Sequence, residues 1–102
     1  MAIPKEFLRS DKIRAVCIIT NLKTEECYLY RTEDAVKSYG DERFKLDIGI
    51  HPSRKLQKAY TSLGLELFTI EIETEAKREE NLDELLERRR KHYLESGRKL
   101  YD

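Results

Sequence analysis

The chain has 102 residues, of which 39% are apolar and another 39% are charged, so it predicts one domain with a small core and a heavily charged surface. Its 20 basic and 20 acidic side chains cancel, which excludes a net basic field but leaves room for a local basic stripe. A membrane-spanning helix needs about 20 consecutive apolar residues, and no apolar run in this sequence is nearly that long. The first residues lack the apolar segment of a signal peptide, so we expect a cytoplasmic protein with no membrane partner.

The two cysteines, Cys17 and Cys27, fall in neighbouring strand candidates. In a reducing compartment they are expected to be small, buried thiols. Two cysteines without further ligands make a poor zinc site, and neither is a candidate nucleophile. The sequence therefore predicts no metal ion held by cysteine.

The sequence predicts a polar lead-in over residues 1–13, followed by one domain over residues 14–102. Residues 14–20 are β-branched and apolar on both faces, a pattern typical of a central strand covered on both sides. The polar stretch 21–26 predicts a turn. Residues 27–30 predict a second strand that completes a hairpin.

A short helix is expected to follow the hairpin, with Thr32 as its N-cap and Gly40 at its end. Asp41 is expected to cap a second short turn, which carries Phe44 and Ile48 on one side. Residues 49–52 are expected to form a loop.

The second half predicts a helix capped by Ser53 and ended by Gly64, a strand over residues 65–73, and a final helix from about residue 79 to residue 96. The apolar residues of the helix after Ser53 recur at helical spacing: Leu56, Ala59, Tyr60 and Leu63. The element order is β-β-α-α-β-α. It predicts an α+β fold, in which helices pack on a small three-stranded antiparallel sheet.

Four short sequence motifs, in this order along residues 14–96, resemble the GIY-YIG nuclease family. The first hairpin strand carries Ala15-Val16-Cys17-Ile18-Ile19-Thr20-Asn21 where the family has Gly-Ile-Tyr and then Ile-Thr-Asn, and the second carries Tyr28-Leu29-Tyr30 for Tyr-Ile-Gly. Many family members carry a further helix motif after the hairpin, followed by a Gly turn and a strand. This motif is similar to Leu56-Gln57-Lys58-Ala59-Tyr60, which is followed by Gly64 and a predicted strand. Leu46-Asp47-Ile48-Gly49-Ile50-His51 resembles a small bacterial subgroup.

The resemblance implies metal-assisted phosphodiester hydrolysis, in which a Glu on the final helix holds a divalent ion. Tyrosines of the hairpin position or activate the water, and an Arg on the helix after the second strand neutralises developing charge. Mg²⁺ or Mn²⁺ would be required only by such an enzyme.

Matched position by position, most of this machinery is replaced. Ala15 and Cys17 occupy the positions of the Gly and Tyr in the first family motif, and Tyr30 occupies the position of the Gly in the second. The Arg position falls on Ser38, beside Lys37. The metal-binding Glu falls on Arg89, or on Arg90 with a shift of one residue, which puts a cation where a divalent ion would sit.

The remaining catalytic candidates are Tyr28, Lys37 and His51. The predicted ligand-binding residues are Arg31, Arg54, Lys58, Arg89 and Arg90.

Each candidate also has a structural interpretation. Tyr28 could be a packing aromatic, and His51 an exposed loop histidine. The basic run 87–92 could be a solvated helix surface that matches the helix dipole. Within that run, an Arg89 on the apolar stripe would need a carboxylate partner.

Three functions therefore remain open. The first is a domain that has lost nuclease activity and binds nucleic acid or a protein. The second is a DNA endonuclease with a rearranged site that uses Tyr28, Lys37, His51 and Glu84 or Glu87. The third is a protein-interaction domain, monomeric or homodimeric.

Overall fold

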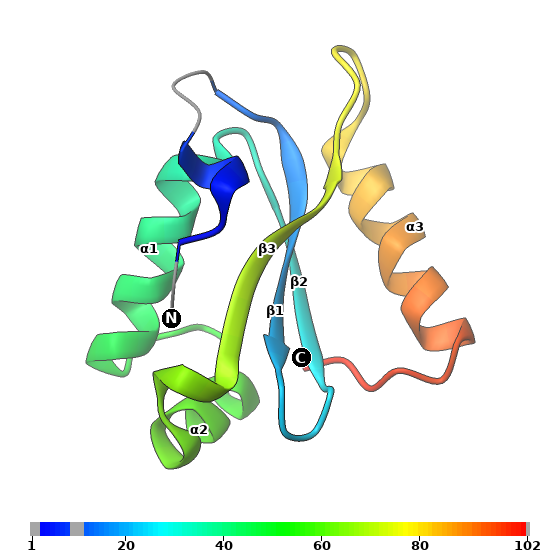
Figure 1. Ribbon diagram of the computed structural model, residues 1–102. Helices are drawn as coiled ribbons and strands as arrows, with labels where there is room; N and C mark the ends of the chain where they lie inside the picture. The colour runs from blue at the N-terminus through cyan, green and yellow to red at the C-terminus, as the bar shows by residue number, and fades with distance from the viewer. Residues whose placement is uncertain (1–2, 9–11, 102) are drawn as a thin grey trace.

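The computed structural model describes residues 3–8 and 12–101 and contains three strands and three α-helices (Figure 1). In chain order the elements are η1 (Lys5–Leu8), β1 (Ala15–Asn21), β2 (Cys27–Thr32), α1 (Ala35–Ile48), α2 (Arg54–Leu63), η2 (Leu65–Leu67), β3 (Phe68–Glu75) and α3 (Leu82–Glu95). The predicted α+β class and element order are confirmed. No helix among the described residues is long and apolar enough to cross a membrane.

The three strands form one antiparallel sheet in the order β2-β1-β3, so β1 is the central strand. Figure 1 shows α1 and α2 on one side of this sheet and α3 on the other. Because successive side chains of a strand point to opposite faces, β1 supplies both cores. This explains why its sequence is apolar without alternation.

The two faces bury different cores. On the α1 and α2 side the core is the larger and contains the aromatic residues Phe7, Tyr30, Tyr39, Tyr60, Phe68 and Tyr101. On the α3 side it is made of Val16, Ile18, Cys27, Leu29, Leu82 and Leu85. Cys17 lies in the first core and Cys27 in the second, so these buried free thiols are on opposite faces of the sheet.

Helix α1 corrects two predictions. It is a single helix that continues through Gly40, and its N-cap is Asp34 rather than Thr32. The Asp34 side chain accepts the backbone N–H of Lys37, and Gly49 ends the helix with a φ of 83°. A glycine inside a helix costs only about 1 kcal/mol relative to alanine, so two good caps and the burial of core residues outweigh it.

The later elements follow the prediction more closely. Ser53 caps α2 through the N–H of Leu56, and Gly64 follows its last residue. The predicted strand began too early, because residues 65–67 form the short helix η2. The final helix begins at Leu82, after its N-cap Asn81, and not near residue 79.

Residues 98–101 return to the sheet after α3. The N–H of Tyr101 donates to the carbonyl of Cys27 at 2.7 Å, and the N–H of Cys27 donates to the carbonyl of Lys99 at 3.1 Å. Tyr101 is buried, and its hydroxyl accepts a hydrogen bond from the Asn21 amide. This C-terminal tail therefore covers part of the outer edge of β2.

Candidate functional site

Two of the predicted catalytic residues lie in contact. Tyr28 is half-buried on β2, on the α1 side of the sheet, and its ring meets the His51 ring edge-on at a centroid distance of 5.1 Å. His51 belongs to the loop between α1 and α2, and its side chain is fully buried. The interpretation of His51 as an exposed loop histidine is therefore wrong.

The surroundings of His51 determine its tautomer. Its Nδ1 accepts the backbone N–H of Ser53 at 3.0 Å, so in the neutral ring the proton lies on Nε2. Nε2 is 3.3 Å from Oε2 of Glu42, a buried carboxylate on α1. These two buried atoms have no well-aligned hydrogen-bond partner among the described residues, so the pair depends on its mutual electrostatic contact.

The electrostatics of the site keep its phenols neutral. Burial raises the pKa of Tyr28, the Glu42 charge raises it further, and the Arg90 charge lowers it, with a net upward shift. Burial also raises the pKa of Tyr30 strongly, with smaller contributions from Cys17 and Glu42. Tyr28 is therefore a neutral hydrogen-bond donor at neutral pH and not a phenolate base.

The Arg90 charge also acts on this site, from α3 on the other side of the sheet. Asp83 and Arg90 are seven residues apart and share one side of α3, and the Asp83 carboxylate pairs with Arg31 of β2 at 2.5 Å. This side of α3 therefore runs along β2, where the Arg90 charge acts on Tyr28. We call Tyr28, Glu42, His51 and Arg90 the Tyr28 cluster.

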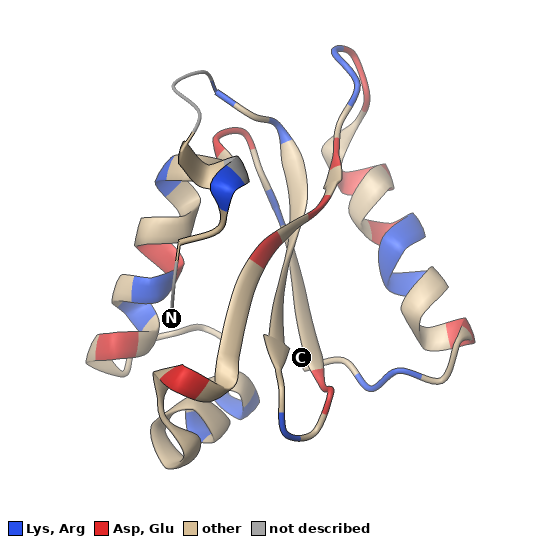
Figure 2. Ribbon diagram, in the orientation of Figure 1, with Lys and Arg blue, Asp and Glu red and all other residues tan. Residues whose placement is uncertain are grey.

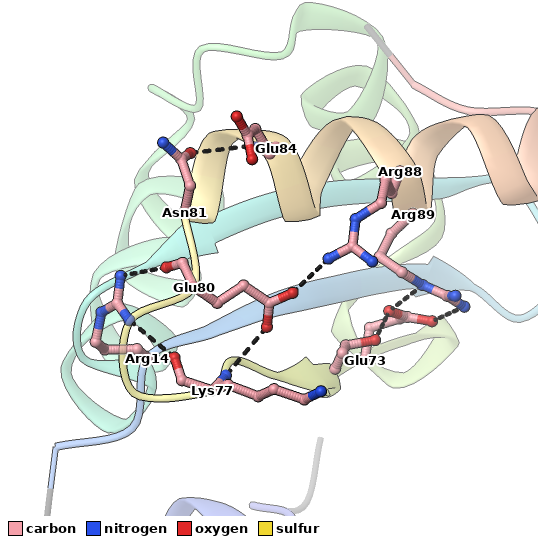
Figure 3. Close-up of polar contacts among 9 residues, drawn as sticks. Arg14, Glu73, Lys77, Glu80, Asn81, Glu84, Arg88 and Arg89 are labelled. Atoms are coloured by element: carbon pink, nitrogen blue, oxygen red, sulfur yellow. Dashed lines mark hydrogen bonds and ion pairs between the residues drawn. The ribbon is translucent and has the colours of Figure 1, made fainter.

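Arg89 lies elsewhere. Its guanidinium donates two hydrogen bonds to the Glu73 carboxylate of β3, at 2.9 and 2.7 Å (Figure 3). The Tyr93 hydroxyl donates to the same carboxylate at 3.0 Å. Burial raises the pKa of Glu73, but the hydrogen bonds from Arg89, Thr74 and Tyr93 lower it more, so the net shift is downward. Glu73 is thus the carboxylate partner that Arg89 requires.

The same side of the molecule contains a second polar anchor. Arg14 donates to the backbone carbonyls of Lys77 and Glu80, and the Glu80 carboxylate pairs with Arg88 (Figure 3). Arg14 also donates to the carbonyl of Arg78. These bonds fix the segment between β3 and α3. They therefore help to hold the N-terminal end of α3 on the sheet.

The other predicted residues are dispersed. Lys37 is exposed and pairs with Asp41 at 3.3 Å, outside the Tyr28 cluster. Arg54 and Lys58 are exposed on α2, which carries only basic charges. They line a surface hollow formed by Gly49, Ile50, His51, Arg54, Gln57 and Lys58. Figure 2 shows that, unlike α2, both α1 and α3 carry acidic as well as basic positions.

The residues around Tyr28 do not fit a divalent cation. Glu42 is the carboxylate whose charge acts on Tyr28, and its Oε2 also lies 3.7 Å from the Lys45 ammonium. The neighbouring His51 Nε2 carries a proton and cannot ligate a metal in this tautomer. Among the described residues, no three His, Cys, Asp or Glu side chains form a group that could hold a metal ion.

Glu42 is the residue of the Tyr28 cluster that the sequence prediction missed. It lies three residues after Tyr39 and four before Leu46, on the buried side of α1. A carboxylate on an apolar stripe is a strong signal, because it must find a partner. The signal was lost because the helix was predicted to end at Gly40.

Comparison with known proteins identifies the fold. No family model matches the sequence, and neither does any curated protein. Among solved structures the chain is similar to the catalytic domain of homing endonuclease I-TevI, with a TM-score of 0.66 and 23% identity over 81% of this chain and 86% of that one. A point mutant of that catalytic domain gives 0.64 and 23% identity, covering 82% of each chain. The chain thus shares the α+β fold of that catalytic domain and is GIY-YIG-like in fold.

Proposed function

We propose that this chain is a GIY-YIG-like domain that has lost metal-dependent phosphodiester hydrolysis and binds nucleic-acid phosphates through the Tyr28 cluster and α2. The observation that carries the proposal is the charge that acts on Tyr28 from α3: Arg90 supplies a positive charge on the helix where the family resemblance implies a metal-binding Glu. A guanidinium is itself a good ligand for a phosphate group.

The remaining groups support phosphate binding. A neutral Tyr28 hydroxyl can donate a hydrogen bond to a phosphate oxygen. Arg54 and Lys58 project from α2 into solvent, beside the hollow that reaches His51. Such contacts to the sugar-phosphate backbone give affinity without sequence preference, and this affinity falls steeply with added salt.

The test is a titration of labelled linear and branched duplex DNA by fluorescence anisotropy at several salt concentrations. Arg90→Gln should weaken binding about 10-fold and reduce the slope of log affinity against log salt by about 1, as expected for one lost phosphate contact. Lys37→Gln is the matched control, because it removes an exposed cation outside the cluster. Binding that is absent or independent of salt would refute the proposal and favour a protein partner.

A working endonuclease with a rearranged site is the second candidate, and one observation favours it. Tyr28, His51 and Glu42 meet in one place, so two hydrogen-bonding side chains lie beside a carboxylate. Cleavage of DNA with Mg²⁺ or Mn²⁺ that disappears in Glu42→Gln would support the enzyme and refute loss of activity. Calorimetry that detects no binding of either ion would exclude it.

Arg90→Glu completes the comparison of the two candidates, because it returns a carboxylate to the side of α3 that faces β2. A silent wild type with an active Arg90→Glu would show that the cation alone blocks catalysis. The same change at Arg89 would not be informative, because it would place a second carboxylate against Glu73.

A further inference from the structure

The Tyr30 ring is enclosed next to the Tyr28 cluster. Tyr30 is 9% exposed and lies in the core on the α1 and α2 side of the sheet. Its ring stacks on that of Tyr28, with the centroids 6.3 Å apart. The Tyr30 hydroxyl is buried and has no well-aligned hydrogen-bond partner among the described residues. Because a buried hydroxyl without a partner costs stability, this position uses the volume of the ring rather than the hydroxyl.

Two short side chains make room for this ring. Cys17 lies directly opposite Tyr30 in the register of β1 and β2, and both side chains belong to the same core. Ser38 lies on α1, where its hydroxyl donates to the backbone carbonyl of Ala35 at 3.0 Å. Both short side chains are close enough to the Tyr30 hydroxyl to affect its pKa, which burial raises strongly. One large side chain thus packs against two small ones that come from two other elements.

These three residues coincide with three departures from the GIY-YIG motifs. In the resemblance, the position of Cys17 belongs to a Tyr, that of Tyr30 to a Gly and that of Ser38 to an Arg. Two large side chains have become small, and the small residue beside them has become large. Protein interiors are close-packed, so a change of volume at one position must be compensated by its neighbours. The three departures are therefore one exchange of volume, and not three separate losses.

We propose that Tyr30 blocks the space between β2 and α1, so that a phosphate can reach the Tyr28 cluster only from its solvent side. The ring occupies the room in which the matched motifs would place a Tyr and an Arg. This inference rests on the proposed function, because it specifies where the bound phosphate lies. Tyr30 thus selects phosphates that stay at the protein surface, and excludes a phosphate that must be enclosed by the protein.

A double-mutant cycle followed by thermal unfolding tests the exchange of volume. Cys17→Tyr alone should lower the Tm by about 10 °C, because two large rings then compete for one space. Tyr30→Gly alone should lower it by about 15 °C or more, because it leaves a cavity. The combined variant should lose less than Tyr30→Gly alone, because the introduced ring fills that cavity. Losses that simply add would overturn the proposal.

A matched control combines Cys17→Tyr with Leu85→Ala. Leu85 lies in the core on the other side of the sheet, so these two losses of Tm should add. If Tyr30→Gly does not fold, the same cycle with the milder changes Cys17→Leu and Tyr30→Leu decides. Tyr30→Phe keeps the ring and should leave the Tm within about 3 °C of the wild type. A larger loss would show that the hydroxyl is required, and would overturn the proposal.

The block itself is tested by the binding of inorganic phosphate, measured by calorimetry. Ser38→Arg alone should gain little affinity, because Tyr30 still fills the space that the new side chain would enter. Ser38→Arg in the Cys17→Tyr/Tyr30→Gly background should bind phosphate at least about 10-fold more tightly than Ser38→Arg alone. Equal affinities would overturn the block. Neither this comparison nor the cycle requires DNA binding by the wild type, so the proposed function can fail separately.

Discussion

The two faces of the sheet are stabilised by different forces. The α1 and α2 face buries a large, mainly apolar core, and its polar Glu42–His51 pair is enclosed next to Tyr28. The α3 face buries a smaller apolar cluster and adds charge pairs, of which Glu73–Arg89 is the most buried. Apolar burial responds little to pH or salt, whereas charge pairs respond to both. The attachment of α3, and with it the position of Arg90, should therefore depend most on solution conditions.

The largest expected effect tests the apolar face. Phe68 is 1% exposed and packs against Tyr60, with ring centroids 5.3 Å apart. Phe68→Ala should lower the free energy of unfolding by about 3–5 kcal/mol, because it removes a large side chain and leaves a cavity. Denaturant unfolding measures this loss. Leu85→Ala on the α3 face should cost about 2–4 kcal/mol, and a larger loss there would reverse the comparison.

The next effect separates the two neighbouring arginines of α3. Arg89→Glu should destabilise the protein by about 3 kcal/mol, because it breaks a partly buried ion pair and sets two carboxylates against each other. Arg90→Glu should change stability by less than about 1 kcal/mol, since the half-buried Arg90 side chain is not part of the Glu73 ion pair. Thermal unfolding of both variants checks this contrast. Equal losses would contradict the assignment of Arg89 to structure and Arg90 to the site.

A third prediction concerns the stability of the folded protein at acidic pH. The folded-state pKa of Glu73 is below its usual 4.5, so its contribution to stability is complete above that value and is lost as the pH falls through the folded-state pKa. Glu73→Gln should therefore flatten the acid side of the stability profile between about pH 5 and pH 2. Glu87→Gln is the matched control, because Glu87 is an exposed carboxylate on the same helix as Arg89.

The smallest expected effect on stability concerns Tyr60, on the apolar face, and it depends on alkaline pH. Burial and the hydrogen bond that the Tyr60 hydroxyl donates to Asp47 raise the pKa of Tyr60 to about 12. Its contribution is complete below the unfolded value of 10 and is lost as the pH rises through about 12. Tyr60→Phe should cost about 1 kcal/mol at neutral pH and almost nothing above pH 12. A difference that persists in strong alkali would contradict this account.

Much of the fold could be predicted because each element has a local signal. The uninterrupted apolar run of β1, the Ser53 cap and Gly64 after α2 each depend on a few neighbouring residues. The continuation of α1 through Gly40 could not be predicted in this way. A glycine ends an isolated helix readily, and only tertiary burial of residues on either side outweighs its cost.

The site was less predictable for the same reason. Tyr28 and His51 were predicted because they match positions in the family motifs. Glu42 lies in no such motif, and it lay beyond the predicted end of its helix. The choice between Arg89 and Arg90 depended on Glu73, which lies on another element and accepts hydrogen bonds from Arg89. Long-range pairs of this kind are set by packing, and spacing along the sequence does not determine them.

The C-terminal tail also has a consequence for solubility. Strand edges with free backbone groups can recruit further strands and start aggregation. At the β2 edge, residues 99–101 occupy part of the backbone that a foreign strand would pair with. The other edge strand, β3, carries the exposed Glu71 and Glu75, and such acidic side chains repel another copy of the same edge. Release of the tail, or replacement of those carboxylates by neutral side chains, would therefore expose the sheet to self-association before the core itself unfolds.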